Sequence, residues 1–141
     1  MSSTQERRIE DAHRLARRLF EVTDQVRATY EKIASALGLT PVQARAVHFL
    51  EQPVPMRALA AHLECDASNV TGVADRLEAQ GYVERVSGLD RRVRLLQLTA
   101  NGQRLRADLA ERVAHAPSPA DRLTPAERTE LHALLDKMLG Q

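Results

Sequence analysis

The amino-acid sequence predicts a mainly α-helical fold with one small β-hairpin, an α+β arrangement, in a single domain of residues 1–141. Three observations predict it. Apolar residues recur at three- and four-residue steps over most of the chain, which is the spacing of one helix face. Glycine, proline and threonine stand where helices typically start and stop. Two short runs with β-branched and aromatic residues flank one turn-rich segment, which is typical of a hairpin.

The first long helix is expected over residues 5–36, because its apolar positions keep helical spacing without an internal proline or glycine. Gly38 suits the position just after a helix, where the backbone often adopts the left-handed conformation. Thr40 and Gln43, around a proline, form the pattern of a capping box. A second helix is therefore expected over residues 41–51.

Pro53 and Pro55 interrupt the helical pattern, and a short third helix is expected after them. Asp66 is a candidate cap for a fourth helix over residues 67–80, which Gly81 closes. The expected inner faces of these two helices consist of Met56, Leu59, Ala60, Leu63, Val70, Val73, Ala74 and Leu77.

The expected hairpin has strands at residues 82–86 and 93–98, joined by the turn-rich segment 87–92. Thr99 can cap a fifth helix, and Thr124 opens a capping box for a last one. An irregular connection is expected between them, at residues 116–120. The core candidates of the fifth helix are Leu105, Leu109 and Val113.

Positive charge is concentrated in one stretch of the chain. Residues 76–106 contain seven arginines and three acidic residues, a formal charge of about +4. From Ala107 onward the balance reverses, with six acidic against four basic residues. A local basic patch of this kind is typical of a protein that binds nucleic acid.

The fourth helix has the side chains that a DNA-reading helix needs. Ser68, Asn69 and Thr71 are short hydrogen-bonding residues near its N-terminus, where base edges lie when a helix enters the major groove. Gly72 would let the backbone approach DNA closely, and Arg76, one turn on, is a candidate phosphate contact. The short third helix, the connection and this fourth helix together form a helix-turn-helix, to which the basic hairpin adds a wing.

The wing carries its own candidates for DNA contact. Arg91 or Arg92 would enter the adjacent minor groove, where narrow A·T-rich segments concentrate negative potential. Asp90, also a candidate, has two interpretations: its carboxylate locks a neighbouring guanidinium by a charge-assisted fork, or it only terminates the turn.

Several short segments combine into one pattern: 39–41, 59–60, 69–78, 81–85, 90–92 and 98–102. Together they resemble the MarR family of bacterial transcription regulators. The resemblance implies a homodimer that binds double-stranded DNA, with dimerisation helices at residues 1–37 and 105–141 and a DNA-binding lobe at residues 39–104. It implies a pseudo-palindromic operator and, by default, a repressor that a small molecule releases. In many relatives an arginine stands where this chain has Gly72.

Regulators similar to this one often sense phenolic or other small aromatic acids. The corresponding residues here would be Tyr30, His48 and a first-helix arginine such as Arg17. The alternative is that Tyr30 and His48 only pack or lie at the surface, since aromatic residues make up 3% of the chain.

Other functions have weaker support in the sequence. The five histidines lack the spacing of a zinc site, Cys65 is alone, and no nucleotide-binding or nucleophile motif occurs, so neither an enzyme nor a bound metal or cofactor is expected. No apolar run approaches the roughly 18 to 20 residues of a membrane span, and a cytoplasmic protein is expected. The main rival function is a winged-helix module that binds another protein.

Overall fold

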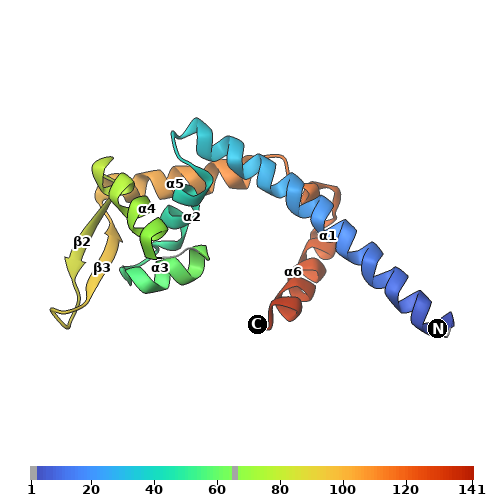
Figure 1. Cartoon of the computed structure of the whole chain (residues 1–141). Helices are drawn as coiled ribbons and strands as arrows, with labels where there is room; N and C mark the ends of the chain where they lie inside the picture. The colour runs from blue at the N-terminus through green and yellow to red at the C-terminus, as the bar shows by residue number, and fades with distance from the viewer. Residues whose placement is uncertain (1–2, 65–66) are drawn as a thin grey trace. The chain divides into compact units, whose positions relative to one another are not determined.

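A computed structural model describes residues 3–64 and 67–141. Contacts divide the chain into two compact units (Figure 1). Unit 1 contains the residues up to Thr29 together with Pro117–Gln141, and unit 2 is Tyr30–Ala116. The elements in order are α1 (Ser3–Ala36), α2 (Pro41–Phe49), β1 (Val54–Pro55), α3 (Met56–Leu63), α4 (Ala67–Ala79), β2 (Val83–Ser87), β3 (Arg94–Leu98), α5 (Ala100–His115), η1 (Pro119–Arg122) and α6 (Pro125–Leu139).

The predicted mainly helical fold with a small hairpin is confirmed, and the hairpin belongs to a three-stranded antiparallel sheet of order β1-β3-β2. Strand β2 pairs with β3 from Val83↔Leu98 to Ser87↔Arg94. Strand β2 thus begins and ends one residue later than the expected range 82–86. The sequence did not predict β1, which pairs Val54 with Leu96. Pro55 is tolerated there because β1 is an edge strand, where a missing N–H leaves no ladder bond unmade.

Local capping chemistry sets the helix boundaries as predicted. The Thr40 hydroxyl accepts from the Gln43 backbone N–H at 3.3 Å, and the Gln43 side chain accepts from the Thr40 N–H at 3.0 Å. Gly38 has φ 71°, the left-handed conformation that glycine adopts without strain. Helix α2 ends at Phe49, two residues before the expected end. The predicted cap Asp66 lies outside the described residues.

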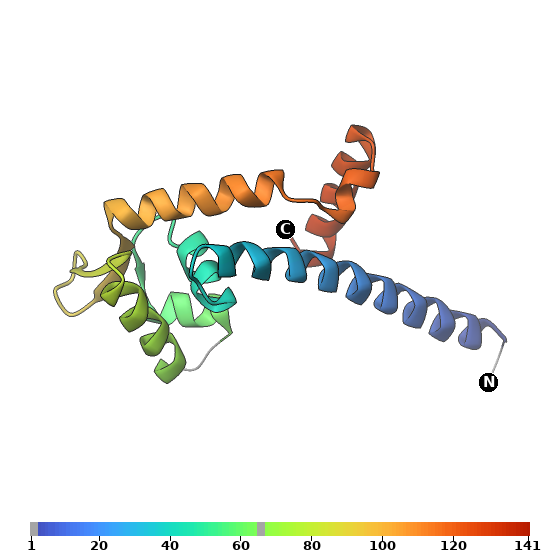
Figure 2. The same cartoon turned by 90° about the horizontal axis from the view of Figure 1, so that it is seen from above.

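The core belongs to unit 2. Its buried apolar side chains come mainly from the end of α1, from α2, α3 and α4, from β2 and β3, and from the first half of α5. Figure 2 shows the ribbon of these elements from above. Leu105 and Leu109 are buried as expected. Val113 is not a core residue, because its side chain is 43% exposed one turn further along α5.

The connection expected to be irregular contains a short 3-10 helix, η1. The Ser118 side chain accepts from the Ala120 N–H at 3.2 Å, and the Asp121 carboxylate accepts from the Ser118 N–H at 2.8 Å. This reciprocal cap stabilises a turn that the pattern of prolines alone did not predict. Among the residues that the structure describes, no helix is long and apolar enough to span a membrane.

One threonine joins α4, the wing and α5. The Thr99 hydroxyl donates to the carbonyl oxygen of Gly81 at 2.6 Å and accepts from the Gly102 N–H at 3.1 Å. The Thr99 N–H donates to the Tyr82 carbonyl at 3.0 Å. Gly102 is buried, and a Cβ there would lie 2.9 Å from the carbonyl carbon of Tyr82 and overlap its oxygen. The wing is therefore fixed to both helices at its base.

Candidate nucleic-acid interface

Helix α4 presents a polar face to solvent. Ser68, Asn69 and Thr71 are exposed in its first turns, and Arg76 is exposed one turn further on. The opposite face is buried, because α4 packs on α2 and α3 in the core. The buried side chains on this face are those of Val70, Val73, Ala74 and Leu77. The predicted base-reading residues therefore lie on the solvent-facing side of the helix.

Gly72 lies among these polar residues, and its surroundings are open. A Cβ added there would meet no atom within 4 Å, apart from the backbone of its own helix. Packing therefore does not require a glycine at this position. Gly72 lowers the stability of an α-helix interior by roughly 0.5 to 1 kcal/mol relative to alanine. A close backbone approach to DNA at Gly72 stays a prediction.

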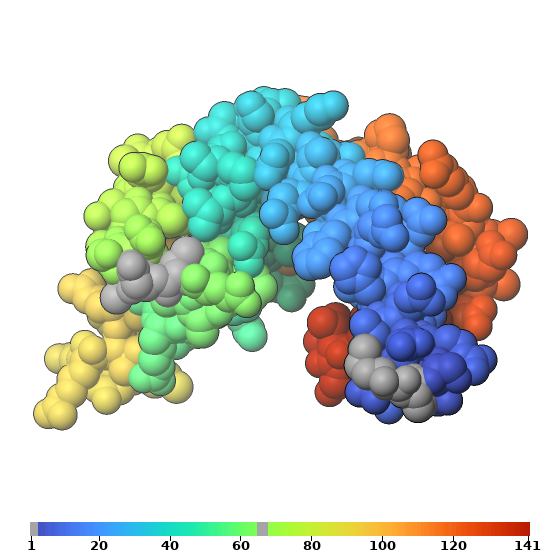
Figure 3. Space-filling model, turned by 45° about the vertical axis from the view of Figure 1, so that its right-hand side comes forward, coloured from blue at the N-terminus to red at the C-terminus, as the bar shows by residue number. Residues whose placement is uncertain are grey.

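The hairpin of β2 and β3 ends in a basic tip that stands away from the rest of unit 2 in the space-filling view (Figure 3). Arg91, Arg92 and Arg94 are exposed. No ion pair holds these three guanidinium groups within the described residues of the chain. They are therefore available for phosphates or for the floor of a groove.

Asp90 acts as a turn residue in the structure. Its carboxylate accepts from the backbone N–H of Arg92 at 3.0 Å, and its carbonyl accepts from the N–H of Val93 at 2.9 Å. The described residues contain no ion pair between Asp90 and a guanidinium. The geometry therefore fits the interpretation that Asp90 terminates the turn, and not the one in which its carboxylate locks a neighbouring arginine. Whether Asp90 contacts DNA stays a prediction.

Arg85 fastens the wing to α4. It projects from β2, and its guanidinium contacts the carboxylate of Asp75 at 2.7 Å and that of Glu78 at 2.8 Å. The hydrogen bond to Asp75 raises the pKa of Arg85, partial desolvation opposes the rise, and Glu78 adds to it. These contacts favour the charged form of Arg85. Its two-armed contact sets the position of the wing relative to the helix.

The sequence did not single out this cluster. The available signal was the pair Asp75 and Glu78, three residues apart on one face of α4, followed by an arginine in the next strand. Spacing along a helix shows that two carboxylates share a face, but it does not show which strand residue reaches them.

Replacing Arg85 by methionine is expected to lower operator affinity by about fivefold, because the wing loses its ion pairs with α4. A largely exposed ion-pair network of this kind contributes about 1 kcal/mol to holding the wing in place, which corresponds to that loss of affinity. Fluorescence anisotropy with an operator duplex measures the change. The slope of log affinity against log salt should stay as in the wild type, because Arg85 neutralises carboxylates rather than phosphates. Arg112→Met, which breaks an ion pair within α5, is the matched control and should leave affinity unchanged.

The predicted effector residues belong to different units. Arg17 lies on α1 in unit 1, where it lines a shallow cavity with Ile9, Glu10, His13 and Arg14. Tyr30 and His48 lie in unit 2. Tyr30 is partly buried, and burial raises the pKa of its hydroxyl while the charge of Arg45 opposes the rise. His48 is exposed. A shared effector pocket for these three residues stays a prediction.

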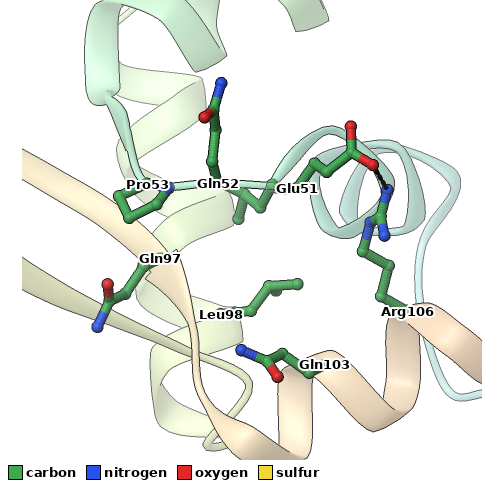
Figure 4. Close-up of a pocket in the computed structure, with 8 residues that line it drawn as sticks. Glu51, Gln52, Pro53, Gln97, Leu98, Gln103 and Arg106 are labelled. Atoms are coloured by element: carbon green, nitrogen blue, oxygen red, sulfur yellow. Dashed lines mark ion pairs between the residues drawn. The ribbon is translucent and has the colours of Figure 1, made fainter.

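Unit 2 has a separate cavity of about 370 Å³ beside the edge of the sheet (Figure 4). Arg106 of α5 contacts Glu51 at 3.3 Å there and donates to the carbonyl of His48 at 3.1 Å. This arginine ties α5 to the end of α2. The predicted effector residues are not among those that line the cavity, which are Leu50, Glu51, Gln52, Pro53, Gln97, Leu98, Gln103 and Arg106.

Outside positions 1, 2, 65 and 66, no three or more histidine, cysteine, aspartate and glutamate side chains gather closely enough to hold an ion.

Comparison with known proteins identifies relatives of this chain. A family model described as "MarR family" matches residues 37–93. The chain is 31% identical over 110 residues to the transcriptional activatory protein BadR of Rhodopseudomonas palustris, an alignment that covers 74% of this chain and 63% of BadR. The chain thus spans somewhat less than two thirds of the length of that relative.

Solved structures agree with the sequence comparison. A MarR-family transcriptional regulator from Rhodococcus sp. RHA1 superposes with a TM-score of 0.75 at 28% identity, over 90% of this chain and 93% of that one. Reduced AbfR, solved bound to DNA, shares the fold with a TM-score of 0.68 at 24% identity, over 96% of both chains. The fold is thus that of solved MarR-family transcription regulators, and the chain resembles the MarR family in sequence and in structure.

Proposed function

We propose that this protein is a homodimeric, sequence-specific DNA-binding transcription regulator that recognises a pseudo-palindromic operator. The observation that carries the proposal is the joined pair of α4 and wing, with Ser68, Asn69 and Thr71 exposed on the helix and Arg91 and Arg92 exposed at the tip. In this arrangement α4 enters a major groove, and the wing reaches the adjacent minor groove.

Charge favours DNA over a protein partner. The net positive charge of residues 76–106 lies on the wing, the end of α4 and the start of α5, whereas the remaining C-terminal residues carry more acidic than basic side chains. Three exposed arginines at one hairpin tip suit the phosphates of a nucleic acid. The same winged fold in AbfR was solved with DNA bound, which supports DNA as the partner of this surface.

Unit 1 supports the dimer. Every buried apolar side chain among the described residues lies between Ala34 and Leu109, so unit 1 has no core of its own. An apolar surface of this extent on two helices indicates a protein interface. We propose that a second copy of the chain covers it. The exposed apolar side chains of unit 1 are Ile9, Leu15, Leu19, Phe20, Val22, Val26, Leu131, Leu134, Leu135, Met138 and Leu139.

A charge placed in this surface should separate the subunits. Leu131 and Leu135 of α6 line an apolar cavity of about 410 Å³ together with Val22 and Val26 of α1. Leu135→Glu is expected to weaken dimerisation by at least about 2 kcal/mol, because the second copy would cover a carboxylate in place of an apolar side chain. Sedimentation equilibrium measures the change. Lys137→Glu, a charge change at an exposed polar position nearby, is the control and should remain dimeric.

The output of the regulator is proposed to be repression, released when a small aromatic or phenolic molecule changes the spacing of the two α4 helices. BadR is named as an activatory protein, and that property belongs to BadR. A promoter-reporter assay with the selected operator placed upstream distinguishes the two outputs: expression rises on deletion of a repressor and falls on deletion of an activator.

The direct test of DNA recognition is selection from a pool of random duplexes with the purified protein at several salt concentrations. A two-fold-symmetric motif whose affinity falls steeply with salt is expected. If no sequence is enriched and binding stays weak at low salt, the proposed function is wrong, and the rival function as a protein-interaction module takes its place.

A further inference from the structure

The tip of the wing has a fixed shape. The N–H of Gly88 donates to the carbonyl of Val93 at 2.8 Å, and the N–H of Val93 donates to the carbonyl of Asp90 at 2.9 Å. The Asp90 carboxylate accepts from the N–H of Arg92 at 3.0 Å. These bonds enclose Leu89 in a closed turn, so its backbone is positioned before any partner binds.

Leu89 is the most exposed large apolar side chain in the described structure, with a relative exposure of 111%. The other exposed large apolar side chains of the described chain lie on α1, α5 and α6, and Leu89 alone lies in the turn between β2 and β3. A single exposed leucine is common on protein surfaces and needs no explanation by itself. Its neighbours therefore decide what it does.

Those neighbours are cationic. Arg91, Arg92 and Arg94 are exposed around the tip, and the one acidic side chain there, Asp90, is used by the backbone of the turn. A partner that suits this tip needs an apolar strip bordered by anionic groups. The minor groove of DNA has this pattern: phosphates line both rims, and the inner walls are formed by the C–H faces of deoxyribose.

We propose that Leu89 enters the minor groove with the arginines and packs against the deoxyribose walls. Both walls contact one side chain only when the groove is narrow, as in A·T-rich sequence. Leu89 thus contributes to the preference of the regulator for A·T-rich flanks outside the positions that α4 reads. The inference rests on the proposed function and adds a residue that determines specificity.

The test compares the wild type with Leu89→Ala and Leu89→Met on two duplexes that share the selected operator core and carry either A·T-rich or G·C-rich flanks. Leu89→Ala is expected to lose about tenfold in affinity for the A·T-rich duplex, because the apolar contact is removed. It should lose much less on the G·C-rich duplex, so its flank preference shrinks. Leu89→Met, which keeps the apolar area, should bind like the wild type.

The salt dependence separates this contact from a charge effect. Leu89 carries no charge, so the slope of log affinity against log salt should be the same for all three proteins. If Leu89→Ala binds the A·T-rich duplex within twofold of the wild type, or keeps the full flank preference, the inference is wrong while the proposed function stands. If the wild type itself enriches no duplex, the proposed function fails, and this inference fails with it.

Discussion

Replacing Gly102 by alanine is expected to lower the free energy of unfolding by about 3 kcal/mol, the largest stability effect we expect from one methyl group in this chain. The new Cβ would overlap the carbonyl oxygen of Tyr82 and press on the side chain of Leu98. The carbonyl cannot move away freely, because it accepts a hydrogen bond from Thr99. Urea unfolding at a fixed protein concentration measures the change.

Gly72→Ala is the matched control, a glycine in another helix with open space around it. It should raise the free energy of unfolding by about 0.5 to 1 kcal/mol, because alanine favours the helix. The same variant should bind operator DNA more weakly if the backbone of α4 approaches the bases at this position. Equal stability changes in the two variants would contradict the packing that the structure assigns to Gly102.

Replacing Arg91 by alanine is expected to produce the largest loss of DNA affinity among single wing variants. A contact with a base edge predicts a loss of about 1 to 3 kcal/mol, concentrated at one operator position. A contact with phosphate predicts a similar loss for all sequences and a salt slope smaller by about one. Anisotropy titrations at several salt concentrations, on the operator and on point-substituted operators, distinguish the two.

Arg112→Ala is the control for the Arg91 experiment, because it also removes one positive charge from unit 2 but lies in α5 in an ion pair with Asp108. It should leave affinity and salt slope unchanged. An Arg91 variant that behaves like this control would place Arg91 outside the interface. The prediction depends on the exposed position of Arg91 at the tip.

Features that depend on neighbours in sequence were predicted best. The capping boxes at Thr40 and Thr124 and the cap at Thr99 all appear in the structure, because each uses a side chain and a backbone N–H no more than three residues apart. Gly38 and Gly81 adopt positive φ for the same local reason. In these places the chain specifies its own structure without help from distant elements.

Features that depend on distant residues were missed. Strand β1 forms only because Val54 meets Leu96 across the sheet, whereas Pro53 and Pro55 suggested a break in the sequence. Val113 continues the apolar spacing of Leu105 and Leu109, but periodicity along α5 does not show where the neighbouring elements stop.

The candidate site follows the same rule. Ser68, Asn69 and Thr71 were predicted because their chemistry and their position at a helix start are local facts. The contact of Arg85 with Asp75 and Glu78 joins residues seven to ten positions apart in different elements. The sequence did not single out Leu89, because an apolar residue in a turn becomes informative only when its exposure is known.

The joint at Thr99 has a mechanical consequence. Its hydroxyl bonds link the end of α4 to the start of α5, Gly102 leaves no clearance beside Tyr82, and Arg85 braces the wing from the other side. Helix α4, the wing and the base of α5 should therefore move together as one rigid body. For the proposed dimer, a change in the distance between the two α4 helices is therefore expected to arise outside this rigid part of the chain, not by bending it.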